Sequence, residues 1–384
     1  MASVLATRTR AAPGRPEQIA TRIVFFIAGF GMSAWAPLVP FAKARAGVSD
    51  GGLGLLLLSL GIGSIIAMPL AGALAAKLGC RRVIVVSAVV MCAVLPALAL
   101  VSSLPLLVAA LVLFGAGLGA VDVVMNIQAI IVERASGRAL MSGFHGCFSL
   151  GTIAGAAGVT VLLSAGSSPG FATIVVVAGI AAALAVAAPY LLPYGGEREG
   201  PAFAVPHGVV LFIGGLCFVL FLTEGAILDW SAVFLTSTRG VDPSRAGVGY
   251  AAFALAMTSG RLTGDRIMQG FGTTRIIGYG GLCASAGFAV ATLLPSWPAA
   301  VLGFALVGVG CANIVPVLFT SVGRQTVMPE NLAVPAMTVL GYAGVLAGPA
   351  AIGFVAQATN LSVAFLSVAL MLIGVAASGY LLRK

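Results

Sequence analysis

One acid, Asp122, lies deep inside the apolar stretch Phe114-Gly-Ala-Gly-Leu-Gly-Ala-Val-Asp122-Val-Val-Met-Asn126-Ile-Gln-Ala-Ile-Ile-Val-Glu133. Such a run predicts a helix that crosses a membrane, because about 20 apolar residues span ~30 Å of hydrocarbon. At about 100° per residue, Asp122, Asn126 and Glu133 fall on one narrow stripe of that helix. An ionised side chain at the bilayer centre costs about 2.5–3.5 kcal/mol on insertion scales, so we expect Asp122 to face a bundle interior and to mark a functional site.

The next segment, Met141-Ser-Gly-Phe-His145-Gly-Cys-Phe-Ser149-Leu-Gly-Thr152, carries a matching polar stripe. It consists of Ser142, His145, Ser149 and Thr152, spaced for one helix face. Two polar stripes on adjacent helices indicate a lined pathway. His145 is expected either to relay protons or contact substrate, or to pack in a bond with Asn126.

The whole chain shares this apolar character. Hydrophobic residues make up 60% of its 384 residues and charged residues only 8%, whereas soluble domains carry about 25% charge. This composition predicts an all-α polytopic membrane protein. The net charge of +9 is scattered over short loops, which argues against a nucleic-acid partner. Six isolated cysteines show no metal-ligand spacing, so we expect neither a metal nor a cofactor.

Twelve apolar runs are long enough to span a bilayer. The first six form an N-terminal bundle over 19–192, and the second six form a C-terminal bundle over 208–384. The twelve predicted spans are at about 19–41, 52–76, 83–103, 105–132, 140–163, 170–192, 208–235, 245–264, 274–294, 299–322, 332–357 and 361–382. A Gly/Pro-rich polar connection, 193–207, separates them as a central cytoplasmic loop. Residues 1–18 are too polar to fold and are expected to be a disordered cytoplasmic tail.

The distribution of basic residues sets the expected topology. With the N-terminus inside, only Lys43, Arg45, Arg239 and Arg245 of the 20 Lys and Arg residues fall outside. This bias predicts an integral protein of the inner (plasma) membrane, embedded in the lipid bilayer as a monomer, with both termini cytoplasmic.

The two halves repeat each other. In the fourth and tenth spans, Gly117-x-Gly119-x-x-Asp122 aligns with Gly308-x-Gly310-x-x-Asn313, and Glu133 aligns with Arg324. The fifth and eleventh spans share Gly151-x-x-x-Gly155 and Gly344-x-x-x-Gly348, a spacing that lets helices pack closely. A duplicated six-helix bundle is expected of a secondary transporter with its site between the halves near the midplane.

The loop after the second span resembles a known signature. Gly72-Ala-Leu-Ala-Ala76-Lys77-Leu-Gly79-Cys-Arg81-Arg82 is similar to the signature of the major facilitator superfamily, except that its acid is Ala76 here. Gly260-Arg261-Leu-Thr-Gly-Asp265-Arg266, followed by Gly272 and Arg275, looks like the degenerate repeat and keeps the acid. The resemblance implies that these loops hold helix ends on the inner face and release them when the halves rock. The expected gating residues are therefore Lys77, Gly79, Arg81, Arg82, Arg261, Asp265 and Arg266.

A narrower resemblance involves the polar stripes. Gly119-Ala-Val-Asp122-Val-Val-Met-Asn126 and Phe144-His145-Gly-Cys-Phe-Ser149-Leu-Gly151 are similar to motifs of the fucose-permease-like branch. That resemblance implies proton-coupled sugar uptake, with Asp122 and His145 at the matching motif positions. The chain departs from sugar-symporting relatives in its first span, where no acid lies between Arg22 and Lys43.

Other polar residues are weaker candidates. Glu224 lies near the middle of the seventh span and is expected to contribute to the proton or substrate site, whereas Asp229 points about 140° away and is expected to be solvated. Glu133 and Arg324 either pair as a gate between the halves or remain solvated helix ends.

The aromatic residues near the outer surface have two interpretations. The tryptophans Trp35, Trp230 and Trp297 fit an interfacial aromatic belt. The alternative for Trp35 and Trp230 is that their rings stack on a sugar.

These features predict a secondary active transporter of a small molecule, coupled to protons, with a sugar-like substrate. Proton-coupled efflux of amphipathic compounds is the first alternative, and a membrane sensor or scaffold that binds without transporting is the second. No G-x-S-x-G, H-E-x-x-H or P-loop sequence occurs, so we do not expect an enzyme.

Overall fold

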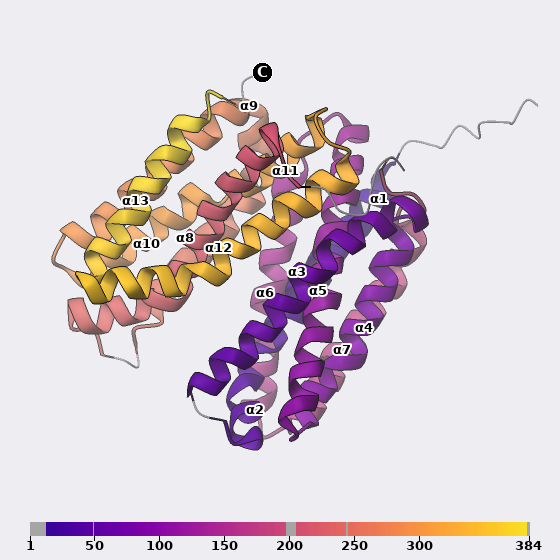
Figure 1. Cartoon of the computed structure of the whole chain (residues 1–384), viewed down its shortest axis with the longest axis horizontal. Coiled ribbons are helices and arrows are strands. Elements are labelled where there is room, and N and C mark those ends of the chain that lie inside the picture. The colour runs from indigo at the N-terminus through magenta and orange to yellow at the C-terminus, as the bar shows by residue number, and fades with distance from the viewer. Residues whose placement is uncertain (1–12, 49, 197–204, 243–244, 382–384) are drawn as a thin grey trace, which may run out of the picture.

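The structure is a computed structural model that describes residues 13–48, 50–196, 205–242 and 245–381. Its regular elements in these ranges are helices (Figure 1). The first half contains α1 (Arg15–Ala34), η1 (Ala36–Leu38), α2 (Val39–Ala46), α3 (Asp50–Leu78), α4 (Cys80–Leu100), α5 (Leu104–Ser136), α6 (Met141–Ser164), α7 (Pro169–Ala187) and η2 (Ala188–Tyr190). The second contains α8 (Gly208–Arg239), α9 (Val248–Leu293), α10 (Trp297–Cys311), α11 (Ile314–Arg324), α12 (Glu330–Ala358) and α13 (Leu361–Ser378).

Eleven helical segments of the described chain are long and apolar enough to cross a membrane. The longest, α9, has 46 residues and contains two spans, because Gly272 leaves the helical conformation with φ 72° and ψ 169°. The middle of α10 contacts both parts: Phe304 packs near Gly249, and Gly303 packs near Gly287. The chain therefore folds back at Gly272 and gives twelve spans, and the predicted all-α polytopic fold is confirmed.

The tenth span is interrupted in its middle. Helix α10 ends at Cys311 and α11 begins at Ile314, with Ala312 and Asn313 between them, so the segment Trp297–Arg324 is not one continuous helix. A break of this kind frees backbone carbonyl groups that buried side chains must satisfy.

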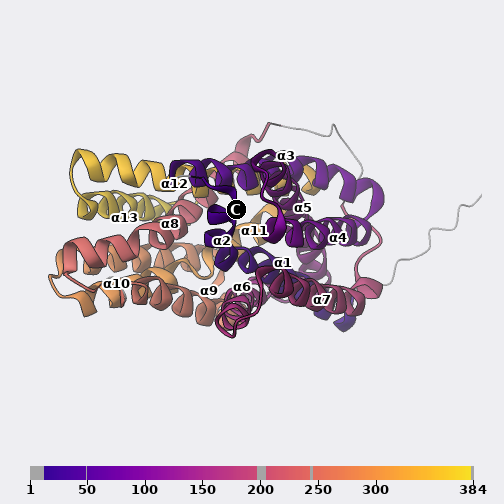
Figure 2. The ribbon, with the colours of Figure 1, turned by 90° about the horizontal axis from the view of Figure 1, so that it is seen from below.

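Helices α1–α7 form an N-terminal bundle and α8–α13 a C-terminal bundle, which lie side by side in two views (Figures 1 and 2). Within each bundle, one helix pair is packed closely by glycine. A side chain at Gly151 of α6 would collide with the Phe26 carbonyl oxygen of α1, and one at Gly344 of α12 would collide with the Phe218 carbonyl oxygen of α8. The predicted small-residue contacts of the fifth and eleventh spans are therefore present in both halves.

The turns at Gly79 and Gly137 and the connections before α8 and α12 lie at one end of the molecule, which we call the predicted cytoplasmic end. Here the N–H groups of Cys80 and Arg81 donate to the carbonyl oxygens of Tyr194 (3.3 Å) and Leu192 (2.8 Å). The buried amide of Gln128 accepts from the Leu192 N–H group at 3.1 Å. The chain that leaves the N-terminal bundle is thus tied to the start of α4.

An arginine in each bundle occupies an equivalent place at the opposite end. Arg45 follows the first span and donates to the Leu98 and Val101 carbonyl oxygens at the end of α4, at 2.7 and 2.9 Å. Arg239 follows the seventh span and donates to the Ala291 and Thr292 carbonyl oxygens at the end of α9, at 2.9 and 2.8 Å. Each cation thereby satisfies the free carbonyl groups of a helix C-terminus.

The start of α1 differs from the expected disordered tail. The helix begins at Arg15, because Pro16 suits the first turn and the Glu17 carboxylate accepts a hydrogen bond from the Gly14 N–H group at 2.7 Å. The rest of that expected tail, residues 1–12, lies outside the described residues, as does 197–204 of the central connection.

Candidate functional site

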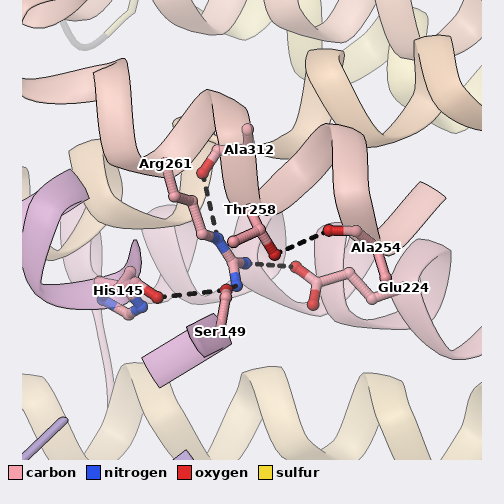
Figure 3. A network of polar contacts seen from close by, with 7 residues as sticks. All are labelled: His145, Ser149, Glu224, Ala254, Thr258, Arg261 and Ala312. Atoms are coloured by element: carbon pink, nitrogen blue, oxygen red, sulfur yellow. Dashed lines mark hydrogen bonds and ion pairs between the residues drawn. The ribbon is translucent and has the colours of Figure 1, made fainter. Parts of the chain in front are cut away.

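The centre of the molecule holds a buried arginine, Arg261 of α9 (Figure 3). Its three guanidinium nitrogens each find an acceptor. Nε donates to the Ala312 carbonyl oxygen (3.3 Å), one terminal nitrogen to Ser149 Oγ of α6 (3.0 Å) and the other to the Glu224 carboxylate of α8 (3.2 Å). One side chain thus binds both bundles and the break in the tenth span.

This placement corrects the sequence interpretation of Arg261. It was counted with the cytoplasmic cations and the gating loop, but its side chain is only 7% exposed and is paired with Glu224. The break at Ala312 provides the reason, since its carbonyl oxygen lacks a helical partner and a planar guanidinium can serve it and a carboxylate together. Removing one partner of such a buried pair leaves an uncompensated charge, at a cost of about 3–5 kcal/mol.

Asp122 of α5 lies on the opposite side of the interface from Tyr342 of α12, and the two side chains interact. Asn126, one turn along α5, is buried and donates to the Asp122 backbone oxygen at 2.8 Å. Both Asp122 and Glu224 lie within electrostatic range of Cys217 in α8. The two predicted acids therefore belong to one region between the bundles.

His145 of α6 is 8% exposed and sits between two aromatic rings. Its ring centroid lies 5.2 Å from that of Phe25 in α1 and 5.5 Å from that of Phe319 in α11. Its Nε2 atom is buried without a hydrogen-bond partner among the described residues. The bond with Asn126 that the sequence left open is not the arrangement found, because the Asn126 amide group bonds its own helix instead.

Asn313, the predicted repeat of Asp122, lies at the break of the tenth span. Its amide nitrogen donates to the Gly260 carbonyl oxygen at 3.1 Å, next to Arg261, while its Oδ1 atom is buried without a partner in the described chain. The duplication therefore places polar side chains at equivalent points of both bundles, an acid in one and an amide in the other.

The predicted tryptophan positions divide into two kinds. Trp35 is 6% exposed, so the aromatic-belt interpretation is wrong for this residue, because the end of α1 packs it inside the protein. Trp230 is half-buried against Gly353. Both indole N–H groups are buried without a partner among the described residues. Trp297 is 49% exposed, as an interfacial residue would be.

At the predicted cytoplasmic end, Glu133 joins the bundles. It is buried, and one carboxylate oxygen accepts from the N–H groups of Leu140 and Met141 at the start of α6, each at 2.8 Å. The other accepts from the Thr320 hydroxyl of α11 at 2.6 Å. The Glu133–Arg324 pair considered from the sequence is thus replaced, and Arg324 is exposed.

Arg134, which the sequence did not single out, also bridges the bundles. It pairs with Glu330 of α12 at 2.8 Å and donates to the Gly323 carbonyl oxygen. A second acid reaches the start of α6 from the C-terminal bundle, since the Asp265 carboxylate accepts from the Gly143 N–H group at 3.0 Å. The contact with the start of α6 has a signal in the sequence. Leu140, just before α6, has no polar side chain to cap the helix, so its free N–H groups need acceptors from elsewhere.

The remaining predicted gating residues lie at the same end, and their charged side chains are at the surface. Lys77, Arg81, Arg82 and Arg266 are exposed, and Gly79 forms the turn between α3 and α4 with φ 86°. Contacts between the bundles therefore use Glu133, Arg134 and Asp265 here rather than the basic residues of the first loop. No group of three or more metal-ligating side chains lies within the described ranges.

Comparison with known proteins identifies the family. The model of the Major Facilitator Superfamily matches residues 23–333. An uncharacterized MFS-type transporter of Yersinia pestis is 57% identical over 95% of this chain and 96% of its own length. The membrane protein MosC of Rhizobium meliloti is 34% identical over 92% of this chain and 87% of its own length.

Solved structures agree on the fold. The E. coli fucose:proton symporter FucP superposes with a TM-score of 0.79 at 15% identity, covering 96% of this chain and 98% of that one. A structure of FucP in the outward conformation gives 0.80 at 16% identity, covering 96% of this chain and all of that one. The polar interface between two six-helix bundles, the family model and these relatives lead to one conclusion: the chain belongs to the Major Facilitator Superfamily.

Proposed function

We propose that this secondary transporter moves a small hydroxyl-rich solute, such as a sugar, together with protons by alternating access of its two bundles. It works as a monomer in the inner (plasma) membrane with both termini cytoplasmic. The observation that carries the proposal is the meeting of ionisable side chains from both bundles inside the helix interface. There, Asp122 faces Tyr342, and Arg261 links Glu224 to Ser149.

The proton site is assigned to Asp122. Among the described residues Glu224 is ion-paired with Arg261, whereas Asp122 has a hydroxyl neighbour and no ion pair. A carboxyl without a cationic partner takes up and loses a proton without breaking a salt bridge, which suits a coupling group. One charge crossing 100 mV supplies about 2.3 kcal/mol, enough for roughly fiftyfold accumulation.

The substrate class follows from unsatisfied polar atoms. Nine buried side-chain atoms lack a hydrogen-bond partner in the described chain, and six of them are Asn126 Oδ1, Asn313 Oδ1, His145 Nε2, Ser231 Oγ and the indole nitrogens of Trp35 and Trp230. Leaving such groups unpaired is costly, so a solute with several hydroxyl groups is a suitable partner for them. An amphipathic drug supplies fewer hydrogen bonds. The fucose:proton symporter with the same fold is consistent with this class.

The test uses purified protein in two steps. A thermal-shift screen against sugars, organic acids and amphipathic compounds first identifies the ligand, because binding raises the stability of the folded state. Proteoliposomes then compare uphill uptake driven by a pH gradient with counterflow. Asp122→Asn keeps the shape of the side chain but cannot titrate, so uptake should be lost while counterflow survives.

Glu224→Gln is the comparison variant of the other bundle: it leaves Asp122 intact but removes the charged partner of Arg261. Uphill uptake by Asp122→Asn at the wild-type level would remove the assigned coupling role, and flux independent of the pH gradient would remove proton coupling altogether. Stabilisation by amphipathic compounds instead of sugars would favour efflux. Ligand binding without counterflow would indicate a sensor or scaffold.

A further inference from the structure

A groove of about 450 Å³ lies on the outside of the N-terminal bundle at the predicted cytoplasmic end. We call it the α3–α4 groove; it is lined by Leu74, Leu78, Arg81, Arg82, Val83, Val85, Val86, Ser87 and Ala188. These residues come from α3, α4 and η2, and several of them, such as Leu78 and Val86, are exposed on the bundle surface. The groove is therefore separate from the polar site between the bundles.

Within the described ranges, no acid offsets the positive charge of the groove. Arg81 and Arg82 are both exposed, no acid lines the groove, and neither arginine forms an ion pair in the described part of the chain. The corresponding stretch of the C-terminal bundle carries Asp265 beside Arg266, whereas this one carries Ala76 beside Lys77. The N-terminal bundle thus holds a pair of guanidinium groups without the acid that its repeat retains.

Two N–H groups at the start of α4 are already occupied. Those of Cys80 and Arg81 donate to the carbonyl oxygens of Tyr194 and Leu192. We therefore expect an anion in the groove to be bound by the arginine side chains rather than by these two amides. Guanidinium groups suit phosphate, which they bind through two hydrogen bonds at once.

The groove has one polar and one apolar end. Arg81 and Arg82 lie in the first turn of α4, and Val86 lies about 6 Å further along the helix, at 1.5 Å per residue. On the antiparallel helix α3, Leu74 likewise lies about one turn further from the helix end than Leu78. Cations at the membrane boundary and aliphatic walls that continue towards the membrane interior match an amphiphile with an anionic head.

We propose that the α3–α4 groove binds an anionic phospholipid, with its phosphate on Arg81 and Arg82 and an acyl chain along Leu74, Leu78 and Val86. Basic pockets between helices near the cytoplasmic surface bind such head groups in other membrane proteins. The site does not depend on which solute is transported.

The experiment titrates the full-length protein in detergent with palmitoyl-oleoyl phosphatidylglycerol or with phosphatidylcholine of the same chains. The apparent affinity is read from the shift of the thermal unfolding midpoint. Wild type should bind phosphatidylglycerol about thirtyfold more tightly than the double variant Arg81→Gln/Arg82→Gln, since two basic contacts are lost. Phosphatidylcholine should not distinguish the two proteins.

The matched control, Arg138→Gln/Arg275→Gln, removes two exposed arginines outside the groove and should bind like wild type. The proposed site would be contradicted if this control lost as much affinity for phosphatidylglycerol as the groove variant does. It would also be contradicted if the groove variant bound phosphatidylglycerol as tightly as wild type. Soluble glycerol phosphate should give no comparable shift; a shift equal to that of the lipid would overturn the assignment to a phospholipid.

A variant that keeps both arginines tests the apolar end. Val86→Trp fills the groove at a side chain that is 62% exposed, so folding is tolerated and the shift with phosphatidylglycerol should fall. An unchanged shift would show that no acyl chain lies there and would contradict the proposal.

Discussion

The bond between Thr320 and Glu133 forms only when the two bundles meet at the predicted cytoplasmic end, because the residues belong to different bundles. Thr320→Val removes the hydroxyl and keeps the shape. A hydrogen bond to a charged group contributes about 1.5–3 kcal/mol. Its loss should therefore shift the equilibrium from bundles in contact to bundles apart by about 10- to 150-fold.

The shift can be measured as a distance between spin labels by pulsed electron resonance. Ala135→Cys and Thr326→Cys place labels on exposed sites of the two bundles at this end. Their attachment requires replacing the partly exposed native cysteines Cys92, Cys147 and Cys283 with alanine. The wild-type background should give mainly the short distance, and Thr320→Val should add a longer one.

Two controls isolate the contact. Ser321→Ala removes a hydroxyl that bonds only Val317 of its own helix, at 2.8 Å, so the distances should not change. Thr320→Ser retains the donor and should resemble wild type. If Thr320→Val and Ser321→Ala give the same distribution as the unmodified background, the Glu133 contact does not hold the bundles together.

Three further substitutions should lower the unfolding midpoint of the purified protein. Gly272→Ala should cost about 1–2 kcal/mol because its φ of 72° disfavours a side chain, whereas Gly270→Ala, with open space and ordinary φ, should not. Gly151→Ala should lower the stability of the fold by about 1–3 kcal/mol, because the added methyl group overlaps α1. Gly158 lies on the same helix but next to open space. An equal effect of Gly158→Ala would therefore argue against close packing as the cause. Arg239→Met should cost about 1–3 kcal/mol because two carbonyl groups lose a charged donor, and an unchanged midpoint would show that water replaces it.

The fold was predictable because hydrocarbon leaves the backbone few options. Each long apolar run must satisfy its own hydrogen bonds as a helix, and the duplicated glycines at Gly151 and Gly344 indicated one closely packed helix pair in each half. Hydropathy also separated the two spans of α9 at the polar residues before Gly272. The break at Ala312 was not foreseen, although Pro316, four residues further on, has no N–H group to donate to the Ala312 carbonyl oxygen.

The site was predictable only in part. Asp122 and His145 were predicted as site residues because polar groups are rare at such depth, and their roles stay predictions. Arg261 was missed because it lies close to a basic loop motif in the sequence, and only the carbonyl group freed at Ala312 explains its burial. Likewise, the partners of Glu133 lie 7 and 187 positions away, so no local pattern could distinguish Thr320 from Arg324.

The paired clamps of Arg45 and Arg239 have a consequence for biosynthesis. Each bonds a helix end of its own bundle, at Val101 or Thr292, so these two helix ends need nothing from the other half. The first half has the partners of Arg45 once α4 has been made, while the ribosome is still translating the second half. Contacts that cross between the bundles, such as that of Asp265 with the start of α6, form only afterwards.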